Sequence, residues 1–148
     1  MSNIIRPFIG VGDFTLLSSE KSVTEILSKC DVPFVKEIWD NDECTVKVPW
    51  SIIRAANSMS FFFANDKLFK IYLCEGFTGS LSNGISIGTN IEDAKQIDPS
   101  LKFDDWNEDW SSDDGYWLED SPDSDKVISI TIFIKEVAND DLFEKYEW

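Results

Sequence analysis

Short β-prone runs, each bounded by turn residues, are the feature that most limits how this chain can fold. Residues 59–64 and 68–74 flank Asn65-Asp66-Lys67 and predict a hairpin, and the isoleucine-rich residues 127–135 predict a long strand. Residues 14–17 predict a further strand near the start. Because consecutive strands joined by tight turns pair side by side, this order favours an antiparallel sheet.

Three other segments are less regular. Residues 33–39 and 44–48 predict a second hairpin, with its turn at the Asx residues of 40–43. Residues 50–57 suit either a strand or a helical turn, and residues 85–87 suit only a very short strand.

Two capping-box patterns predict short helices between these strands. A Ser-x-x-Glu pattern opens residues 22–29, and a Thr-x-x-Glu pattern opens residues 89–97, just before Pro99. Residues 140–146 favour a third, closing helix. The prediction is a single α+β domain over residues 1–148, with a mostly antiparallel β-sheet and two or three short helices on one face.

The composition predicts a folded cytoplasmic protein. A length of 148 residues suits one domain, and a hydrophobic share of 43% is enough to form its core. No apolar stretch approaches the roughly 20 residues that a membrane helix requires, and the first ten residues lack a signal-peptide run.

The charge balance favours one class of partner. Acidic residues outnumber basic ones by 28 to 13, which gives a formal net charge of −15. DNA, RNA and anionic membranes are therefore disfavoured as partners, and a positively charged protein is favoured. The alternative is that the acidity serves solubility alone.

The sequence contains no catalytic or cofactor motif. It has no histidine, the commonest general base near neutral pH, and Cys30, Cys44 and Cys74 form no C-x-x-C pair. The glycines within residues 76–80 and 84–88 fit turns and helix caps. We expect reduced, partly buried thiols, no metal, no cofactor and no enzymatic activity.

A one-sided acidic segment is the main candidate for function. Residues 104–125 contain ten acidic residues and no Lys or Arg. Large aromatic side chains of the kind that dominates protein interfaces are interleaved with them: Trp106, Trp110, Tyr116 and Trp117. This combination is typical of protein recognition. The alternative is that the rings pack beneath an exposed acidic loop, with Trp117 pointing inward from a strand.

Two chemical alternatives apply to the same segment. Residues 105–109 match the D-x-N-x-D start of a calcium loop, but Trp110 occupies the glycine position and Tyr116 the position of the bidentate glutamate. This mismatch argues against calcium. Paired carboxylates also suit a carboxylate or metal-dependent hydrolase, although no single acid is marked by its sequence context as the catalytic one.

A resemblance adds to this interpretation. A hairpin, the Gly84-Ile85-Ser86-Ile87-Gly88-Thr89 step into a short helix, the Asp114-Gly115-Tyr116-Trp117 stretch and an isoleucine-rich strand follow one another between residues 14 and 136. This layout resembles bacterial immunity proteins, the antitoxins of contact-dependent growth inhibition and other polymorphic toxin systems. The resemblance implies a cytosolic protein that binds the C-terminal domain of a toxin, often a basic nuclease.

The hypothesis is therefore an immunity protein that occludes the active site or substrate groove of a basic toxin domain. The expected toxin-binding residues are Asp104, Asp105, Trp106, Glu108, Asp109, Trp110, Asp113, Asp114 and Tyr116. Cys30, Ile71 and Ile130 are expected to contribute to stability instead. The main alternative is an acidic scaffold domain that joins an oligomer through its Trp-rich edge.

Overall fold

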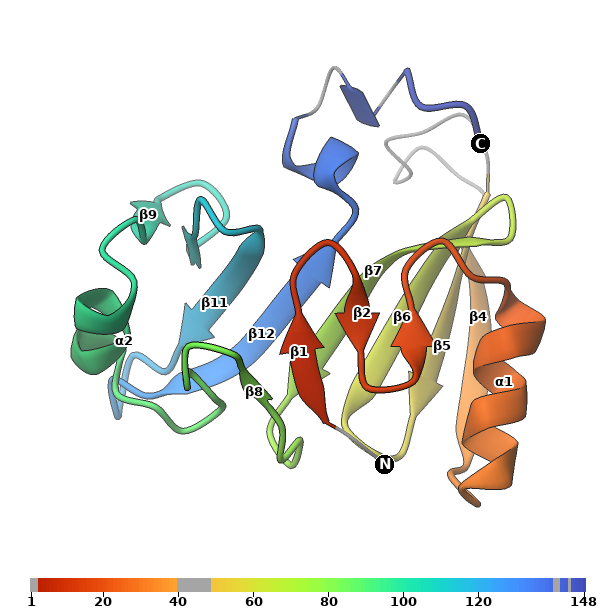
Figure 1. Ribbon diagram of the computed structural model, residues 1–148, viewed down its shortest axis with the longest axis horizontal. Coiled ribbons are helices and arrows are strands. Elements are labelled where there is room, and N and C mark those ends of the chain that lie inside the picture. Colours follow the sequence, from red (N-terminus) through yellow and green to blue (C-terminus); the bar gives the residue numbers. More distant parts are fainter. Residues whose placement is uncertain (1–2, 40–48, 140–141, 144) are drawn as a thin grey trace.

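The computed structural model describes residues 3–39, 49–139, 142–143 and 145–148. Within these residues the chain forms a large and a small sheet, both visible in Figure 1. The large sheet is antiparallel, in the order β4-β5-β6-β7-β12-β11-β10-β9, and the small mixed sheet has the order β3-β2-β1-β8. The predicted α+β class with a mostly antiparallel sheet is confirmed.

The large sheet contains β4 (Phe34–Trp39), β5 (Trp50–Ala55), β6 (Met59–Ala64), β7 (Lys67–Cys74), β9 (Lys102–Asp104), β10 (Asp109–Ser111), β11 (Tyr116–Asp120) and β12 (Val127–Phe133). The small sheet contains β1 (Ile4–Arg6), β2 (Gly10–Val11), β3 (Phe14–Thr15) and β8 (Ser80–Leu81). The helices are α1 (Glu20–Lys29), α2 (Ile91–Ile97) and the 3-10 helix η1 (Lys135–Ala138).

One face of the large sheet, the core face, packs against the small sheet and both α-helices (Figure 1). Ile71 and Leu73 of β7 alternate along their strand, as do Ile130 and Ile132 of β12, and all four are fully buried. Side chains from α1, α2 and the small sheet join the same buried cluster. Apolar residues at every second position thus form the floor of the core.

The opposite face of the large sheet, the polar face, presents a different set of side chains. Tyr72, Thr131, Trp117 and Ser111 form a row of directly paired residues across β7, β12, β11 and β10. Paired residues point to the same side of a sheet. Lys70 lies two residues before Tyr72 and so faces the same side.

The central hairpin is confirmed as β6 and β7. Its turn is Asn65-Asp66, and both residues have positive φ angles, 48° and 62°, which a two-residue hairpin turn requires. Oδ1 of Asp66 accepts a hydrogen bond from the backbone N of Glu20 at 2.9 Å. The turn therefore also holds the start of α1 against the sheet.

Both α-helices begin at a residue other than the predicted one. α1 begins at Glu20 because Ser19 is its cap, and Oγ of Ser19 accepts a hydrogen bond from the backbone N of Ser22 at 3.2 Å. The cap of α2 is Asn90, whose Oδ1 accepts from the backbone N of Glu92 at 2.9 Å. In each helix a neighbouring Ser or Asn takes the cap position, for which these residues are strongly preferred.

Some predictions concern residues beside gaps in the described structure. The ambiguous residues 50–57 contain strand β5, which pairs with β4. Residues 40–48, the predicted turn and second strand of that hairpin, lie outside the described residues. The predicted closing helix at residues 140–146 is partly outside them, but Phe143 within it is buried against Trp50.

Two predicted strands are shorter than expected. Residues 14–17 contain only the two-residue β3, because Leu17 has a φ of 70° and leaves strand geometry. Residues 85–87 form no strand, and Ser86 makes only an isolated bridge to Ser80.

The residues expected to support stability differ in their positions. Ile71 and Ile130 are fully buried. Cys30, by contrast, is exposed at the end of α1, so the structure does not support a stabilising role for it. None of the helices in the described part of the chain is long and apolar enough to cross a membrane.

Candidate interaction site

The acidic segment forms a three-stranded meander at one edge of the large sheet, not the exposed loop that its composition suggested. β9, β10 and β11 pair antiparallel in sequence order, and β9 is the last strand of the sheet. Asp104 and Asp109 are cross-strand partners where the β9–β10 hairpin turns. We call residues 104–109 the acidic tip.

The carboxylate of Asp104 holds the acidic tip in one conformation. Its Oδ1 accepts hydrogen bonds from the backbone N of Trp106 at 2.9 Å and of Asn107 at 3.3 Å, and its Oδ2 accepts one from Nδ2 of Asn107 at 2.9 Å. These hydrogen bonds, led by those from Asn107, lower the pKa of Asp104. Glu108 closes the turn with a φ of 56°.

Trp106 projects from the acidic tip into solvent. Its side chain is 92% exposed, more than any other large hydrophobic residue in the described part of the chain. Asp105 and Glu108 beside it are also exposed. Because an indole ring gains much from burial, an exposed ring on a hydrogen-bonded turn among carboxylates is well suited to a protein partner.

Asp109 stands half-buried at the base of the acidic tip. Its pKa is raised by burial first, and then by the negative charges of Asp104 and Glu119. Glu119 is itself held by a hydrogen bond from Oγ of Ser129 at 2.5 Å. The three carboxylates together give this side of the polar face a concentrated negative charge.

Two tryptophans of the acidic segment support the meander from opposite faces. Nε1 of Trp110 donates a hydrogen bond to Oδ1 of Asp120 at 3.0 Å, and its ring lies 5.1 Å from the ring of Phe103. Trp117 packs its half-buried ring 4.3 Å from the ring of Phe133. Both therefore hold the hairpins in place, and neither projects as Trp106 does.

Asp113 and Asp114 lie exposed in the turn between β10 and β11. The backbone N of Asp114 donates to Oγ of Ser112 at 3.0 Å. Gly115 follows with a φ of 97°, and a Cβ at this position would meet the ring of Phe8 at 2.2 Å. The turn thus presents two carboxylates on a backbone that only glycine allows.

Tyr116 does not belong to the exposed surface. It is 1% exposed, and its hydroxyl donates a hydrogen bond to Asp98 and accepts one from Nδ2 of Asn83 at 3.3 Å. Burial, and then the hydrogen bond to Asp98, raise its pKa to about 12. Direct contact between Tyr116 and a partner is therefore not supported.

Asp98, which the sequence interpretation missed, is the buried carboxylate that joins α2 to the meander. It accepts hydrogen bonds from the backbone N of Ser100 at 3.0 Å, from Oγ of Ser112 at 2.5 Å and from the Tyr116 hydroxyl. Burial alone would raise the pKa of Asp98, but the hydrogen bonds from these three residues outweigh it and lower the pKa.

A cavity of about 410 Å³, here the polar cavity, opens on the polar face beside the acidic tip. Asp104 and Asp109 line one end, and Lys70, also missed from the sequence, lines another part. The full lining is Trp50, Phe69, Lys70, Asp104, Asn107, Asp109, Ser111, Trp117, Val137, Ala138 and Phe143. Charged and aromatic groups therefore share one cavity.

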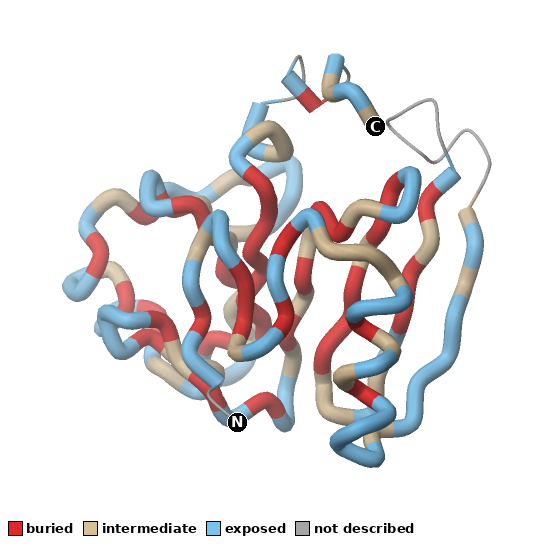
Figure 2. The backbone as a smooth tube through the Cα atoms, turned by 45° about the vertical axis from the view of Figure 1, so that its right-hand side comes forward, coloured by how far each residue is buried: buried red, intermediate tan, exposed pale blue. Residues whose placement is uncertain are grey.

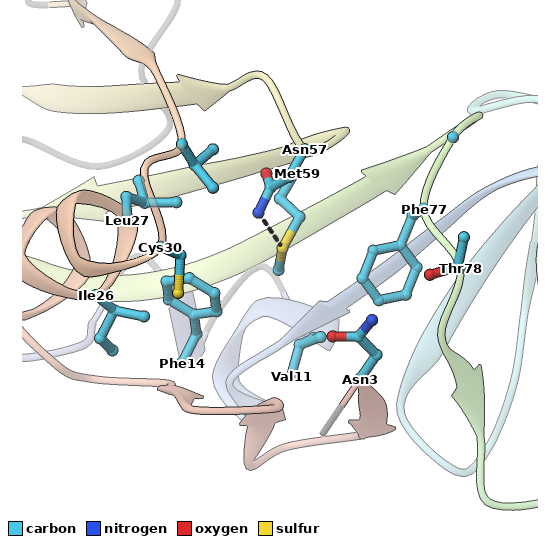
Figure 3. A pocket seen from close by; sticks show the side chains of 12 residues that line it. Asn3, Val11, Phe14, Ile26, Leu27, Cys30, Asn57, Met59, Phe77 and Thr78 are labelled. Carbon is cyan, nitrogen blue, oxygen red and sulfur yellow. Dashed lines mark hydrogen bonds between the residues drawn. The ribbon is translucent and has the colours of Figure 1, made fainter. Parts of the chain in front are cut away.

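A second cavity, of about 340 Å³, lies on the core-face side between α1 and the small sheet (Figure 3). Its walls are mainly apolar, with Phe14, Leu27 and Phe77 among them. Nδ2 of Asn57 donates a hydrogen bond to Sδ of Met59 at 3.3 Å within it. Because this cavity lies across the sheet from the polar face, it is separate from the acidic tip.

Within the described ranges, no group of three Asp, Glu or Cys side chains is arranged to hold a metal ion. No family model, curated protein or solved structure matches the chain. The geometry of the acidic tip and its surroundings is therefore the basis for a functional proposal.

Proposed function

We propose that this protein is an immunity-type inhibitor that binds and neutralises the C-terminal domain of a basic toxin, a nuclease, of a contact-dependent growth inhibition system. It acts by covering the active site or substrate groove of the toxin, and it catalyses no reaction itself. The observation that carries the proposal is Trp106, 92% exposed on a tip whose conformation Asp104 fixes.

In the acidic tip and the neighbouring turn, the carboxylates and Trp106 contribute to different steps of binding. Asp105, Glu108, Asp113 and Asp114 are exposed carboxylates, and such charges accelerate the approach of a basic partner by about 10- to 1,000-fold at low salt. Each contributes little to the final affinity because it stays hydrated at the rim. Trp106 supplies the apolar anchor that slows dissociation.

Preorganisation supports the same role. The hydrogen bonds from the backbone N of Trp106 and Asn107 to Asp104 exist in the free protein. A partner therefore does not have to order this turn, and the entropy cost of association is reduced.

The first test is co-purification of the tagged protein with the product of the gene immediately upstream, followed by elution at rising salt. A one-to-one complex with a basic protein is expected, and its association rate should fall steeply as salt rises. The variant Trp106→Ala should weaken the complex by about thirtyfold, the effect of losing a central hot spot.

A double charge reversal separates the contribution of the carboxylates to the association rate from the contribution of Trp106 to affinity. Asp105→Lys with Glu108→Lys should slow association, whereas the control Asp123→Lys reverses one acid that is also exposed but lies outside the acidic tip, and it should have a much smaller effect. Unchanged affinity in Trp106→Ala and in the reversal pair, with the fold intact, would refute the proposal. A self-assembled oligomer and no captured partner would favour the scaffold alternative.

A further inference from the structure

Among the described residues, Lys70 makes no side-chain hydrogen bond or ion pair. Its Nζ lies 4.2 Å from the centre of the Phe62 ring and 5.9 Å from that of Trp50. The ion pairs of the described residues are formed by other cations, and none involves Lys70. Cation–π contact with these rings stabilises part of the positive charge, but the rings cannot replace the oxygen acceptors that an ammonium group prefers.

A second unpartnered donor belongs to Trp50, which lines the same cavity. Nε1 of Trp50 is buried and has no hydrogen-bond partner in the described structure. Buried donors without acceptors are rare in proteins, and each needs an explanation. Among the described residues, the donors of Lys70 and Trp50 therefore both lack an acceptor, and a negatively charged group would satisfy them best.

Two phenylalanines lie beside these donors. Phe69 and Phe143 line the cavity with ring centres 5.4 Å apart, and Trp50 lies 5.0 Å from Phe69. Going beyond the proposed function, we infer that this part of the polar cavity binds a small apolar carboxylate. Its carboxylate accepts hydrogen bonds from Lys70 and Trp50, and its hydrocarbon body lies against the two phenylalanines.

The carboxylates of the acidic tip do not prevent this binding. β7 and β10 are separated by three strand spacings, which is about 14 Å along the sheet. The pKa of Asp109 responds to Asp104 and Glu119, and that of Lys70 is lowered to about 8 by burial alone. Repulsion over this distance is weak compared with the attraction between an anion and an ammonium group in contact with it, because the Coulomb energy falls with distance.

The test compares benzoate with benzyl alcohol, which has the same ring and no charge, by titration of the purified protein at pH 7 in 0.15 M salt. Benzoate should bind at least about tenfold more tightly, because hydrogen bonds to charged groups are the stronger ones. Nuclear magnetic resonance should show the largest shifts at the Trp50 indole N–H and the Lys70 side chain.

Variants locate the site. Lys70→Met should weaken benzoate binding by at least about tenfold, and Trp50→Phe, which keeps a ring but removes the donor, should weaken it less. Lys67→Met is the matched control, since Nζ of Lys67 already donates to the carbonyl of Glu147 at 3.1 Å. Raising the pH to 9.5 should weaken binding by an order of magnitude or more, because Lys70 loses its proton.

Several results would overturn the inference. These are equal binding of benzoate and benzyl alcohol, no binding of benzoate at about 10 mM, or unchanged binding in a folded Lys70→Met variant. The test needs no protein partner, so its outcome is independent of whether the toxin complex forms.

Discussion

Lys70, which is half-buried, and Asp98, which is buried, are charged residues with opposite consequences for stability. Burial lowers the pKa of Lys70 because the loss of water around the ammonium group outweighs its contacts with aromatic rings. Hydrogen bonds lower the pKa of Asp98 in spite of burial, because they stabilise its charged form. The first residue therefore costs stability at neutral pH, and the second contributes it.

Replacing Lys70 by Met should stabilise the protein by about 3 kcal/mol at pH 7. The folded pKa of about 8 lies below the ordinary lysine value of 10.5, so the cost of the charge is fully present below pH 8 and disappears as the pH rises from 8 to 10.5. Urea unfolding of both proteins at several pH values measures this difference. A gain that persists unchanged at pH 10.5 would contradict the electrostatic explanation.

Replacing Asp98 by Asn should destabilise the protein by about 2 kcal/mol at pH 7, since hydrogen bonds from Ser100, Ser112 and Tyr116 to a carboxylate are lost. The folded pKa lies below the unfolded value, so this contribution is present above about pH 4 and is lost as the pH falls through the folded pKa. The unfolding free energies of the two proteins should converge in acid.

Among the elements, the central hairpin could be predicted from the sequence because its signals are local. β6 and β7 are long, apolar and joined by an Asn-Asp turn. The three-residue strands β9 and β10 give no such signal, and they exist because they pair with β11 and each other. Pairing between distant residues is not visible in a short window of sequence.

The candidate site was predictable only in part, because the burial of its residues also depends on distant parts of the chain. The exposed positions of Asp105 and Trp106 agree with the predicted interaction surface, although binding itself is untested. Tyr116 is buried because it shares the core face with Leu118, and a shift of one residue in register reverses which face a side chain takes. Lys70 and Asp98 gain their properties from burial, which composition does not reveal.

The turn between β10 and β11 depends on a single glycine. Gly115→Ala should destabilise the protein by about 2 to 3 kcal/mol, because the new Cβ meets the Phe8 ring at 2.2 Å and the φ of 97° is strained for alanine. In a Phe8→Ala background the clash is absent, and the same substitution should cost only about 1 kcal/mol. Equal costs in both backgrounds, measured by urea unfolding, would show that the ring contact is unimportant.

For the whole molecule, the two ends of the large sheet differ sharply. The β9 end carries the acidic tip, and the β4 end exposes Val35 and Ile38, which are 61% and 66% accessible. Figure 2 shows β4 as a largely exposed strand beside the buried strands of the sheet. In the described structure no further strand pairs with β4, an arrangement that promotes association between copies.

Net charge should control this association. At 0.15 M salt the charge of −15 keeps copies apart and a monomer is expected, whereas at about 1 M salt the Debye length falls to about 3 Å and oligomers should form. Light scattering across this range measures the change. The double variant Val35→Lys and Ile38→Lys should stay monomeric throughout, and a wild-type protein that does the same would disprove the role of β4.

A basic partner bound at the β9 end would act on the β4 end as well. It would neutralise much of the negative charge of the molecule while leaving Val35 and Ile38 uncovered. The complex would then have lower colloidal stability than the free inhibitor, since proteins near zero net charge precipitate more readily. Recognition at one end of the sheet and dispersal of the molecule in solution therefore depend on the same carboxylates.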